Sequence, residues 1–455
     1  MFEAVSKLSA GARAWAAGFP ARFQRKISQG AYRPEVDGLR FFAIAFVIFG
    51  HSLERAARFF ASYRDALGGT ALEAHLQTAP LGVDLFFAIS GFILANQAIK
   101  VGTNPLGGAF LKAYFGRRVL RIEPPYIILL VATWVFISLT GFVPDGTHRF
   151  DVEPASLSVS LLGGVFYLHD LIWGTFPRLF PPGWSLEVEV QFYIVAPLLF
   201  WLWARTSATR TRATMAATFF AVGVLLSILD LKTLGPAHVE FSLLRFFNFF
   251  WLGIVLAYAR GPLTAWIAGR SAAFATALGW GGLALCVGLP GSQDMADAQS
   301  LTEALWLPSV YLGLAAVFVS TFAPHSGFRA FCVKPWISLI GGACYSIYLV
   351  HLQVTQVIAG AVAKLAPGLP MIGVLATFVA SALVVLVVGL TYYVSIERQF
   401  MTRNWHLLVW ARVKAAFGAG AAPAPQSSRP ELVASKPDTV RQPPADERRR
   451  RIAVR

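Results

Sequence analysis

Residues 35–52, EVDGLRFFAIAFVIFGHS, place an apolar stretch between Asp37 and Arg40 at one end and His51 at the other. The apolar span Val36–Leu53 comes close to the roughly 20 mostly apolar residues that a helix needs to cross a membrane. Holding an ionisable group inside such a span costs roughly 2.5–3.5 kcal/mol on insertion scales. The segment therefore predicts a transmembrane helix whose polar side chains serve a function.

Apolar stretches of this kind recur along the whole chain. Its 455 residues are 56% hydrophobic and only 14% charged, and the mean hydropathy is +0.58, which indicates an integral membrane protein. The fold class that we predict is all-α, a polytopic membrane bundle of about ten transmembrane helices. The predicted spans are Val36–Leu53, Leu81–Ile99, Pro125–Val143, Val188–Ala204, Ala213–Leu231, Phe241–Ala259, Ser271–Leu289, Ala304–Ala323, Ile337–Val362 and Met371–Ile396.

The charges of the loops predict the orientation of these spans, because cytoplasmic loops carry an excess of Lys and Arg. Alternate loops hold the basic residues Arg117, Arg118, Arg121, Arg205, Arg210, Arg212, Arg260, Arg329 and Lys334. The other loops hold Asp145, Asp151, Glu153, Asp294 and Asp297. Both termini are then cytosolic, in a multi-pass protein of the inner (cytoplasmic) membrane. This requires that Ser156–Ile172 does not cross, and we expect it to be re-entrant or on the outer surface.

The two ends of the chain differ from its centre in composition. Residues 1–34 predict a basic cytosolic or interfacial segment, residues 35–400 the membrane domain, and residues 401–455, rich in Pro, Ala and Arg, a disordered cytosolic tail. The formal charge of +15 lies in loops and termini, so nucleic acid is not an expected partner. The three cysteines show no CxxC spacing, and no disulfide framework or metal site is predicted.

Arg40 and His51 lie on one face of the first span. Eleven residues at about 100° each bring His51 back to within roughly 20° of Arg40, about 16 Å further along the helix axis. An imidazole in the outer half of the membrane suits a general base. The alternative is that Arg40 extends to the cytosolic headgroups and His51 hydrogen-bonds a neighbouring helix. Asp37 is expected to line the same site.

Three further segments bring polar side chains into spans. The segment GVDLFFAISGFILA carries Asp84, and PPGWSLEVEVQFY carries Trp184, Ser185, Glu187, Glu189 and Tyr193; CYSIYLVHLQ carries Tyr345, Ser346 and His351. The predicted topology places Asp84, Glu189 and His351 in the outer half with His51, where either carboxylate could orient the imidazole. Glu189 should point into the bundle, whereas Glu187 could face water. The alternatives are that the carboxylates complement helix dipoles and that His351 is structural.

Basic residues gather in the segment FGRRVLRIEPPY, on the predicted cytosolic side. Arg118 and Arg121 are one helical turn apart, with Arg117 beside them, and such a group can bind phosphates through paired hydrogen bonds. The alternative is that these arginines only set the membrane orientation.

Five segments in this order resemble the successive motifs of the acyltransferase-3 family over roughly Glu35–Glu397. They are EVDGLRFFAIAFVIFGH, GVDLFFAISGFI, RRVLRIEPPY, PPGWSLEVEVQFY and CYSIYLVH. The resemblance implies transfer of an acyl group, commonly acetyl from acetyl-CoA, to a hydroxyl of an extracytoplasmic or lipid-linked glycan. Its Arg-x₁₀-His signature falls on Arg40 and His51. Where the family often has a second acid after Glu189, this chain has Val190, while Glu187 fills a variable place.

The expected function is therefore membrane O-acylation, with no permanently bound cofactor and acetyl-CoA as the donor substrate. The nucleotide end would dock at Arg118 and Arg121, and His51, held by Asp84 or Glu189, would deprotonate the acceptor or carry the acyl group itself. The expected partners are membrane lipid, acyl-CoA and a glycan or lipid-linked saccharide. The alternative is a transporter or flippase that uses the intramembrane His and carboxylates as a proton relay.

Overall fold

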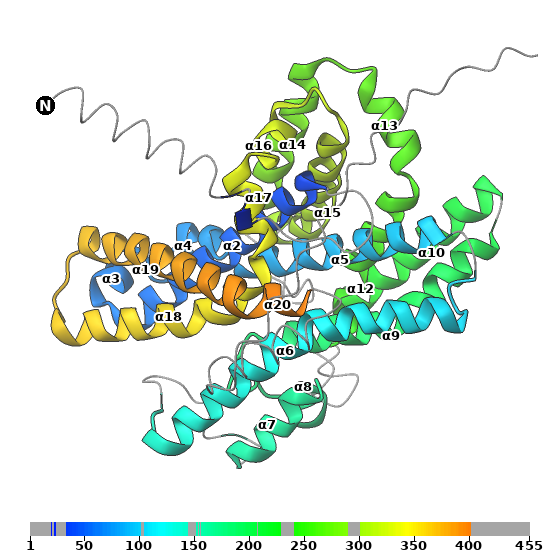
Figure 1. Ribbon diagram of the computed structural model, residues 1–455. Coiled ribbons are helices and arrows are strands. Elements are labelled where there is room, and N and C mark those ends of the chain that lie inside the picture. Colours follow the sequence, from blue (N-terminus) through cyan, green and yellow to red (C-terminus); the bar gives the residue numbers. More distant parts are fainter. Residues whose placement is uncertain are drawn as a thin grey trace, which may run out of the picture. The chain divides into compact units, whose positions relative to one another are not determined.

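The computed structural model describes residues 20, 22–23, 33–101, 104–143, 152, 154, 156–206, 208–228, 241–289 and 301–401. All of them belong to one compact unit of the chain. This part contains helices and no strand, which confirms the all-α class (Figure 1). The predicted N-terminal segment and the predicted C-terminal tail lie almost entirely outside the described residues.

The described part of the chain forms a succession of helices. Their bounds are α2 (Pro34–Phe59), α3 (Ala61–Leu67), α4 (Ala71–Leu76), α5 (Ala79–Val101), α6 (Gly108–Thr140), α7 (Leu157–Val165), α8 (His169–Trp173), α9 (Gly183–Arg205), α10 (Thr209–Ile228), α12 (Leu243–Tyr258), α13 (Arg260–Ala268), α14 (Ala272–Val287), α15 (Leu301–Phe322), α16 (Gly327–Cys332), α17 (Pro335–Gly342), α18 (Cys344–Leu365), α19 (Met371–Tyr392), the π-helix η3 (Tyr393–Glu397) and α20 (Arg398–Phe400).

Seven helical stretches of the described chain are long and apolar enough to cross a membrane. They are Pro34–Phe59, Ala71–Val101, Gly108–Thr140, Gly183–Arg205, Leu305–Phe322, Cys344–Leu365 and Met371–Phe400. The pair α12 and α13, bent by 67° at their junction, would make an eighth. The protein is therefore a multi-pass membrane protein, as the composition predicts.

The predicted count of ten spans is not confirmed. Helices do occupy the three remaining predicted places, as α10, α12 and α14. However, α14 has only 16 residues, and α12 also has 16 before the chain bends at Ala259. A straight helix of 16 residues is about 24 Å long, short of a hydrocarbon core of about 30 Å.

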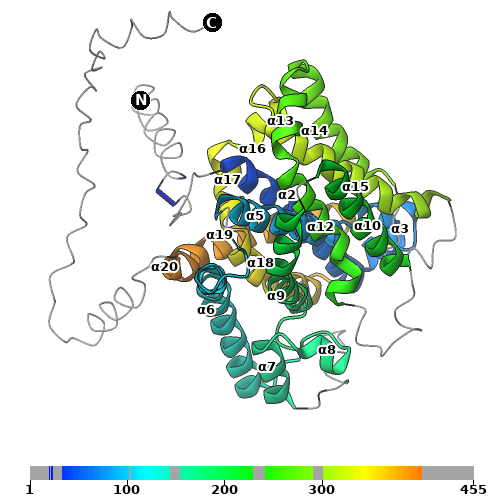
Figure 2. The ribbon, with the colours of Figure 1, turned by 90° about the vertical axis from the view of Figure 1, so that its right-hand side faces the viewer.

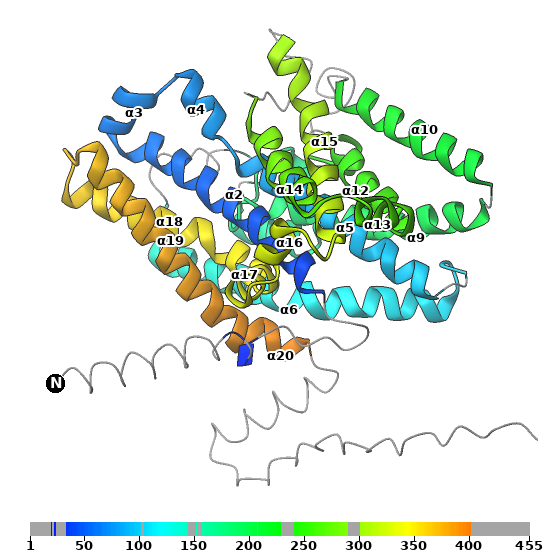
Figure 3. The ribbon, with the colours of Figure 1, turned by 90° about the horizontal axis from the view of Figure 1, so that it is seen from above.

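Helix α2 lies in the middle of the bundle, with α5, α17 and α18 packed against it (Figure 3). The next layer includes α12, which packs on α5 through glycines. A Cβ on Gly91 would lie 2.1 Å from the carbonyl oxygen of Phe250, and one on Gly253 would lie 2.0 Å from that of Ala88. Only glycine permits this close approach of two helix backbones, which is common between transmembrane helices.

The segment Ser156–Ile172 forms two short helices, α7 and α8, which pack against α6 and α9 (Figure 2). With nine and five residues, neither is long enough to cross a membrane. This agrees with the prediction that the segment does not cross.

Candidate active site

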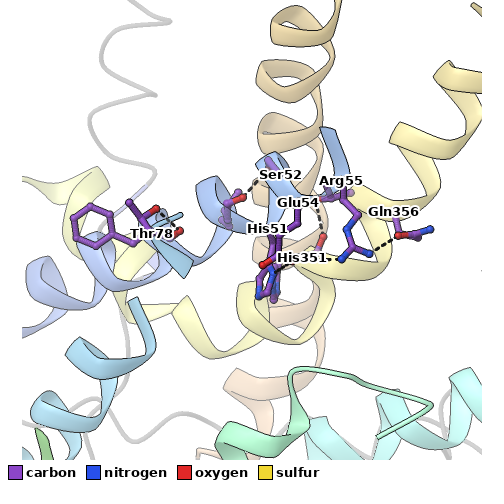
Figure 4. A network of polar contacts seen from close by, with 10 residues as sticks. His51, Ser52, Glu54, Arg55, Thr78, His351 and Gln356 are labelled. Carbon is purple, nitrogen blue, oxygen red and sulfur yellow. Dashed lines mark hydrogen bonds and ion pairs between the residues drawn. The ribbon is translucent and has the colours of Figure 1, made fainter. Parts of the chain in front are cut away.

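His51 and Glu54 form a hydrogen-bonded pair one turn apart on α2 (Figure 4). His51 Nδ1 lies 2.8 Å from Glu54 Oε2, and 21% and 37% of the two side chains remain exposed. Because an ionised carboxylate can only accept, Nδ1 carries the proton and Nε2 keeps a lone pair. The prediction that Asp84 or Glu189 holds His51 is wrong: the carboxylate comes from the same helix.

Arg55 connects this pair to a second helix. Its Nη2 atom donates to Glu54 Oε2 at 3.4 Å, and its Nη1 atom donates to Gln356 Oε1 of α18 at 2.6 Å. The guanidinium thus bonds the same carboxylate oxygen that faces His51. The end of α2 is thereby tied to α18.

His351 lies beside His51, as the topology predicts (Figure 4). The ring centroids are 5.2 Å apart, and His351 is fully buried. Its Nδ1 atom lies 2.6 Å from the carbonyl oxygen of Tyr348, one turn back on α18. Its Nε2 atom is buried without a hydrogen-bond partner among the described residues.

Tyr348 joins the histidine pair to the start of α9. Its ring centroid lies 5.3 Å from that of His351. Its hydroxyl lies 2.7 Å from Ser185 Oγ and donates to the carbonyl oxygen of Pro182 at 3.0 Å. Ser185 therefore lies next to the site, as predicted. Tyr348 is not among the site residues predicted from the sequence, although its spacing of three residues places it on the same face of α18 as His351.

Asp84 does not take part in this cluster. Its carboxylate is buried, with 1% of the residue exposed, and neither oxygen has a hydrogen-bond partner among the described residues. The charge that acts on it most strongly belongs to Arg245 of α12. The structure therefore gives Asp84 no contact through which it could orient His51.

Glu189 points into the bundle, as predicted, but it contacts different residues from those expected. Its Oε1 atom accepts hydrogen bonds from Ser90 of α5 at 2.6 Å and from the hydroxyl of Tyr193. Tyr193 in turn lies near Arg118, whose guanidinium carbon is 5.5 Å from the ring centroid. Glu189 thus belongs to the arginine end of the bundle.

The packing of α5 on α2 explains this position. A Cβ on Gly50 would lie 2.3 Å from the amide nitrogen of Ala79, and one on Gly82 would lie 2.7 Å from Cγ2 of Val47, so the two helices run antiparallel. Ser90, which donates to Glu189, comes eight residues after Gly82. It therefore lies about 12 Å further toward the start of α2. The prediction that Glu189 shares the level of the histidines is therefore wrong. Helix α9 begins at that level, and each later residue lies further from it.

Glu187 is fully buried and does not face water, contrary to the interpretation of the sequence. Its two oxygens accept hydrogen bonds from the backbone amides of His169, at 3.1 Å, and of Asp170, at 3.0 Å. These amides begin the short helix α8, whose end would otherwise be unsatisfied. Glu187 therefore fixes the α7–α8 segment and is not available to replace the missing second acid.

His169 is a buried histidine of the same segment. Its Nε2 atom lies 3.0 Å from Ser160 Oγ, and its Nδ1 atom lies 3.0 Å from the carbonyl oxygen of Thr175. Burial lowers the pKa of His169 to about 4, so the ring is neutral at physiological pH.

The arginines differ in how far they are buried. Arg118, with 8% exposed, donates to the carbonyl oxygen of Tyr114 and to Gln97 Oε1, the latter at 3.0 Å. Its guanidinium carbon also lies 3.7 Å from the ring centroid of Tyr114. Arg117 and Arg121 are partly buried and more accessible. Part of the hydrogen-bonding capacity of the Arg118 guanidinium is therefore already used inside the bundle.

Arg40 does not extend to the headgroups. It is 6% exposed and donates to the carboxylate of Asp37, which is also buried. The alternative that Arg40 only reaches toward the membrane surface does not match this buried pair. Arg40 and His51 lie at different levels of α2, about 16 Å apart.

The remaining predicted residues hold helices together. Tyr345 donates to the carbonyl oxygen of Ile122 at 2.8 Å, and the ring of Trp184 packs 4.9 Å from that of Phe241. The amide and hydroxyl of Ser346 donate to Glu397 at 3.2 and 2.6 Å, which ties the start of α18 to the π-helix. Glu397 is not among the predicted site residues, although it lies at the last position of the resemblance.

The described residues provide a candidate base but no candidate metal site. Among the residues that the structure describes, no three His, Cys, Asp or Glu side chains gather in a way that could hold a metal ion. The imidazole of His51 has a lone pair on Nε2 and a carboxylate behind it, a combination that is chemically able to remove a proton from a hydroxyl or to take an acyl group.

Comparisons with known proteins agree with the motifs. Residues 33–394 match the acyltransferase-3 family, described as "Acyltransferase domain". The chain is 26% identical over 224 residues to "Putative peptidoglycan O-acetyltransferase YrhL" of Bacillus subtilis, covering 48% of this chain and 32% of that protein. It is 25% identical over 267 residues to "Nodulation protein 10" of Rhizobium leguminosarum bv. viciae, covering 53% and 69%. It is 31% identical over 201 residues to "Protein 2 in picA locus" of Rhizobium radiobacter, covering 42% and 88%.

No solved structure is significantly similar to this one. The match spans about a third of the Bacillus protein and about two thirds of the nodulation protein. The family match covers the whole membrane part of the chain, including His51, Glu54, Glu189 and His351. The chain therefore belongs to the acyltransferase-3 family, and its multi-pass membrane part carries the acyltransferase domain of that family.

Proposed function

We propose that this enzyme transfers an acetyl group from acetyl-CoA to a hydroxyl of a glycan or a lipid-linked saccharide, in the inner (cytoplasmic) membrane. The observation that carries the proposal is the His51–Glu54 pair, which leaves Nε2 of a partly exposed imidazole as the proton acceptor. Relatives named as O-acetyltransferases support the acetyl group and a saccharide acceptor.

The reaction needs one proton to move twice. Nε2 of His51 takes the proton of the acceptor hydroxyl while the hydroxyl oxygen attacks the thioester carbonyl carbon. The tetrahedral intermediate then breaks its C–S bond, and the CoA thiolate takes the proton from His51, which gives the ester and free CoA. Glu54 stabilises the imidazolium that forms between these steps.

Acetyl-CoA would enter from the opposite end of the bundle. Its phosphates would bind at Arg117, Arg118 and Arg121, and its flexible arm would reach past Tyr193 and Glu189 toward His51. The cation–π contact between Arg118 and Tyr193 supports this path because it places the arginines beside residues that lead into the bundle. Positive charge at the entrance favours the anionic nucleotide.

The direct test incubates membrane vesicles that contain the protein with acetyl-CoA labelled in the acetyl group, together with the cell-envelope saccharide fraction from a strain that lacks the gene. Covalent label in the saccharide is the expected result. Uptake of label into the vesicles without a covalent product would instead support the alternative of a transporter.

Removing the two more accessible arginines tests the donor site. Arg117→Ala combined with Arg121→Ala should raise the KM for acetyl-CoA by about tenfold or more, because hydrogen bonds to charged groups contribute about 1.5–3 kcal/mol each. Lys112→Ala, which removes an exposed positive charge from the same helix, is the matched control. An unchanged KM in the double variant would leave these residues with a role in membrane orientation alone.

A further inference from the structure

His351 is more deeply buried than a general base needs to be, and one of its nitrogens has no partner. It is fully buried, its Nδ1 atom is engaged by the carbonyl oxygen of Tyr348 at 2.6 Å, and its Nε2 atom is buried without a partner in the described part of the chain. Leaving such an atom unpaired costs about 1–3 kcal/mol. A ligand that donates a hydrogen bond to this atom would remove the cost.

The chemistry of that ligand follows from the tautomers. A carbonyl oxygen can only accept, so Nδ1 of His351 carries the proton and its Nε2 atom can only accept. The same holds for His51, whose Nδ1 atom faces Glu54. Two nitrogens that both accept therefore lie on rings whose centroids are 5.2 Å apart (Figure 4). Such a pair fits a ligand that presents two donors close together.

The charges beside the two rings balance each other. Glu54 and Arg55 both lie close enough for their charges to act on His351, and Arg55 donates to Glu54 beside His51. A ligand between the two rings therefore needs no charge of its own, and a pair of hydroxyl groups supplies two neutral donors. Hydroxyls on neighbouring carbons can each reach one nitrogen with hydrogen bonds of about 2.8 Å.

We propose that His51 and His351 together bind two adjacent hydroxyl groups of the acceptor. His51 deprotonates the hydroxyl that is acetylated, and His351 holds its neighbour, which stays free. The inference rests on the proposed function and adds the acceptor class to it, a saccharide with a vicinal diol. A diol that already carries one ester lacks the second donor and is rejected, since a site built to bond a hydroxyl discriminates strongly against analogues without it.

Two substitutions of His351 separate this role from a structural one. His351→Asn keeps an amide where Nδ1 stands and loses the acceptor at Nε2, whereas His351→Gln places an amide oxygen near Nε2. Labelled acetyl transfer is measured while the saccharide fraction described above and acetyl-CoA are titrated in turn. His75→Asn, which replaces a half-buried histidine on α4 away from the site, is the matched control.

The expected result is a rise of at least tenfold in the apparent KM for the saccharide in His351→Asn, with the KM for acetyl-CoA unchanged and partial recovery in His351→Gln. A fall in kcat with both KM values unchanged, or no recovery in His351→Gln, would overturn the proposal in favour of a structural or proton-carrying role. Thermal unfolding of the purified variants shows whether they are folded.

A second measurement uses the wild-type enzyme and does not depend on any variant. Periodate cleaves the bond between carbons that carry adjacent hydroxyls, so mild treatment of the saccharide fraction should remove its capacity to accept label. Undiminished labelling after complete oxidation would contradict the vicinal-diol site. If the untreated fraction accepts no label from the wild-type enzyme, the proposed function itself fails, so the two failures are distinct.

Discussion

Glu54 determines which nitrogen of His51 can act as a base. Its carboxylate fixes the proton on Nδ1 and directs the lone pair of Nε2 away from α2. Because the two residues are one turn apart, the pairing depends on the helix itself and on Arg55, which bonds the same oxygen. The base is therefore assembled by one element before any other helix packs against it.

Replacing Glu54 should reduce turnover and leave donor binding intact. Glu54→Ala should lower kcat by about 10²-fold, the scale of a general-base contribution, with the KM for acetyl-CoA unchanged. Glu54→Gln keeps an oxygen that can accept from Nδ1 and should lose less. Asp65→Asn, an exposed carboxylate on α3, is the control. A kcat within twofold of wild type in Glu54→Ala would show that the pair is not used in the reaction.

The sequence predicts local contacts of the site better than contacts between helices. Arg40 and His51 can be placed on one face from the helical period, and the same period would have found Glu54. The contact of Tyr348 with Ser185 depends on how α18 packs against α9, and no local pattern encodes it. The partner of His51 is local and lies within reach of such a pattern, whereas the predicted partners Asp84 and Glu189 lie on other helices.

The short helix α8 depends on one carboxylate, that of Glu187. Glu187→Ala leaves the amides of His169 and Asp170 unpaired and should destabilise the α7–α8 segment by about 1–3 kcal/mol. Faster hydrogen exchange over residues 157–173 would show this effect. Glu187→Gln retains one acceptor and should exchange at an intermediate rate. Wild-type exchange in Glu187→Ala would mean that the carboxylate does not hold the segment.

Hydropathy predicts where helices lie but not how they bend. All ten predicted spans overlap helices, because apolar length is a local property, but the span Ile337–Val362 is divided at Ala343 between α17 and α18. The 67° bend after α12 was predicted only as the end of a span at Ala259. It falls just before Pro262, which lies in the first turn of α13 and has no amide hydrogen with which to continue the hydrogen bonds of α12. The direction of the second helix depends on packing against α15, which the sequence does not show.

The predicted membrane orientation of the whole molecule can be tested by labelling single cysteines. The three native cysteines are buried, so a single new cysteine can be labelled selectively. In right-side-out vesicles, an impermeant maleimide should react with Thr140→Cys. Lys100→Cys should react only after the membrane is opened. Both positions are exposed at the ends of long helices. The reverse pattern would invert the topology and place the arginines outside.

The polar residues follow the bundle from one end to the other. Arg118, Tyr193 and Glu189 lie at one end, and Tyr348 and the two histidines lie at the other, with α2 between its neighbours throughout. A bundle that buries polar groups at both ends can bind a donor on one side of the membrane and an acceptor on the other. The proposed transfer from a cytosolic donor to an acceptor on the other side of the bilayer would use this separation.

The most direct test of His51 as the base is to measure acetyl transfer by His51→Ala and by the wild-type protein in vesicles that contain equal amounts of each. We expect transfer from labelled acetyl-CoA to the saccharide to fall at least 10²-fold, the lower range of general-base catalysis, while the variant remains inserted and folded. Transfer at the wild-type rate would contradict the assignment of His51 as the base.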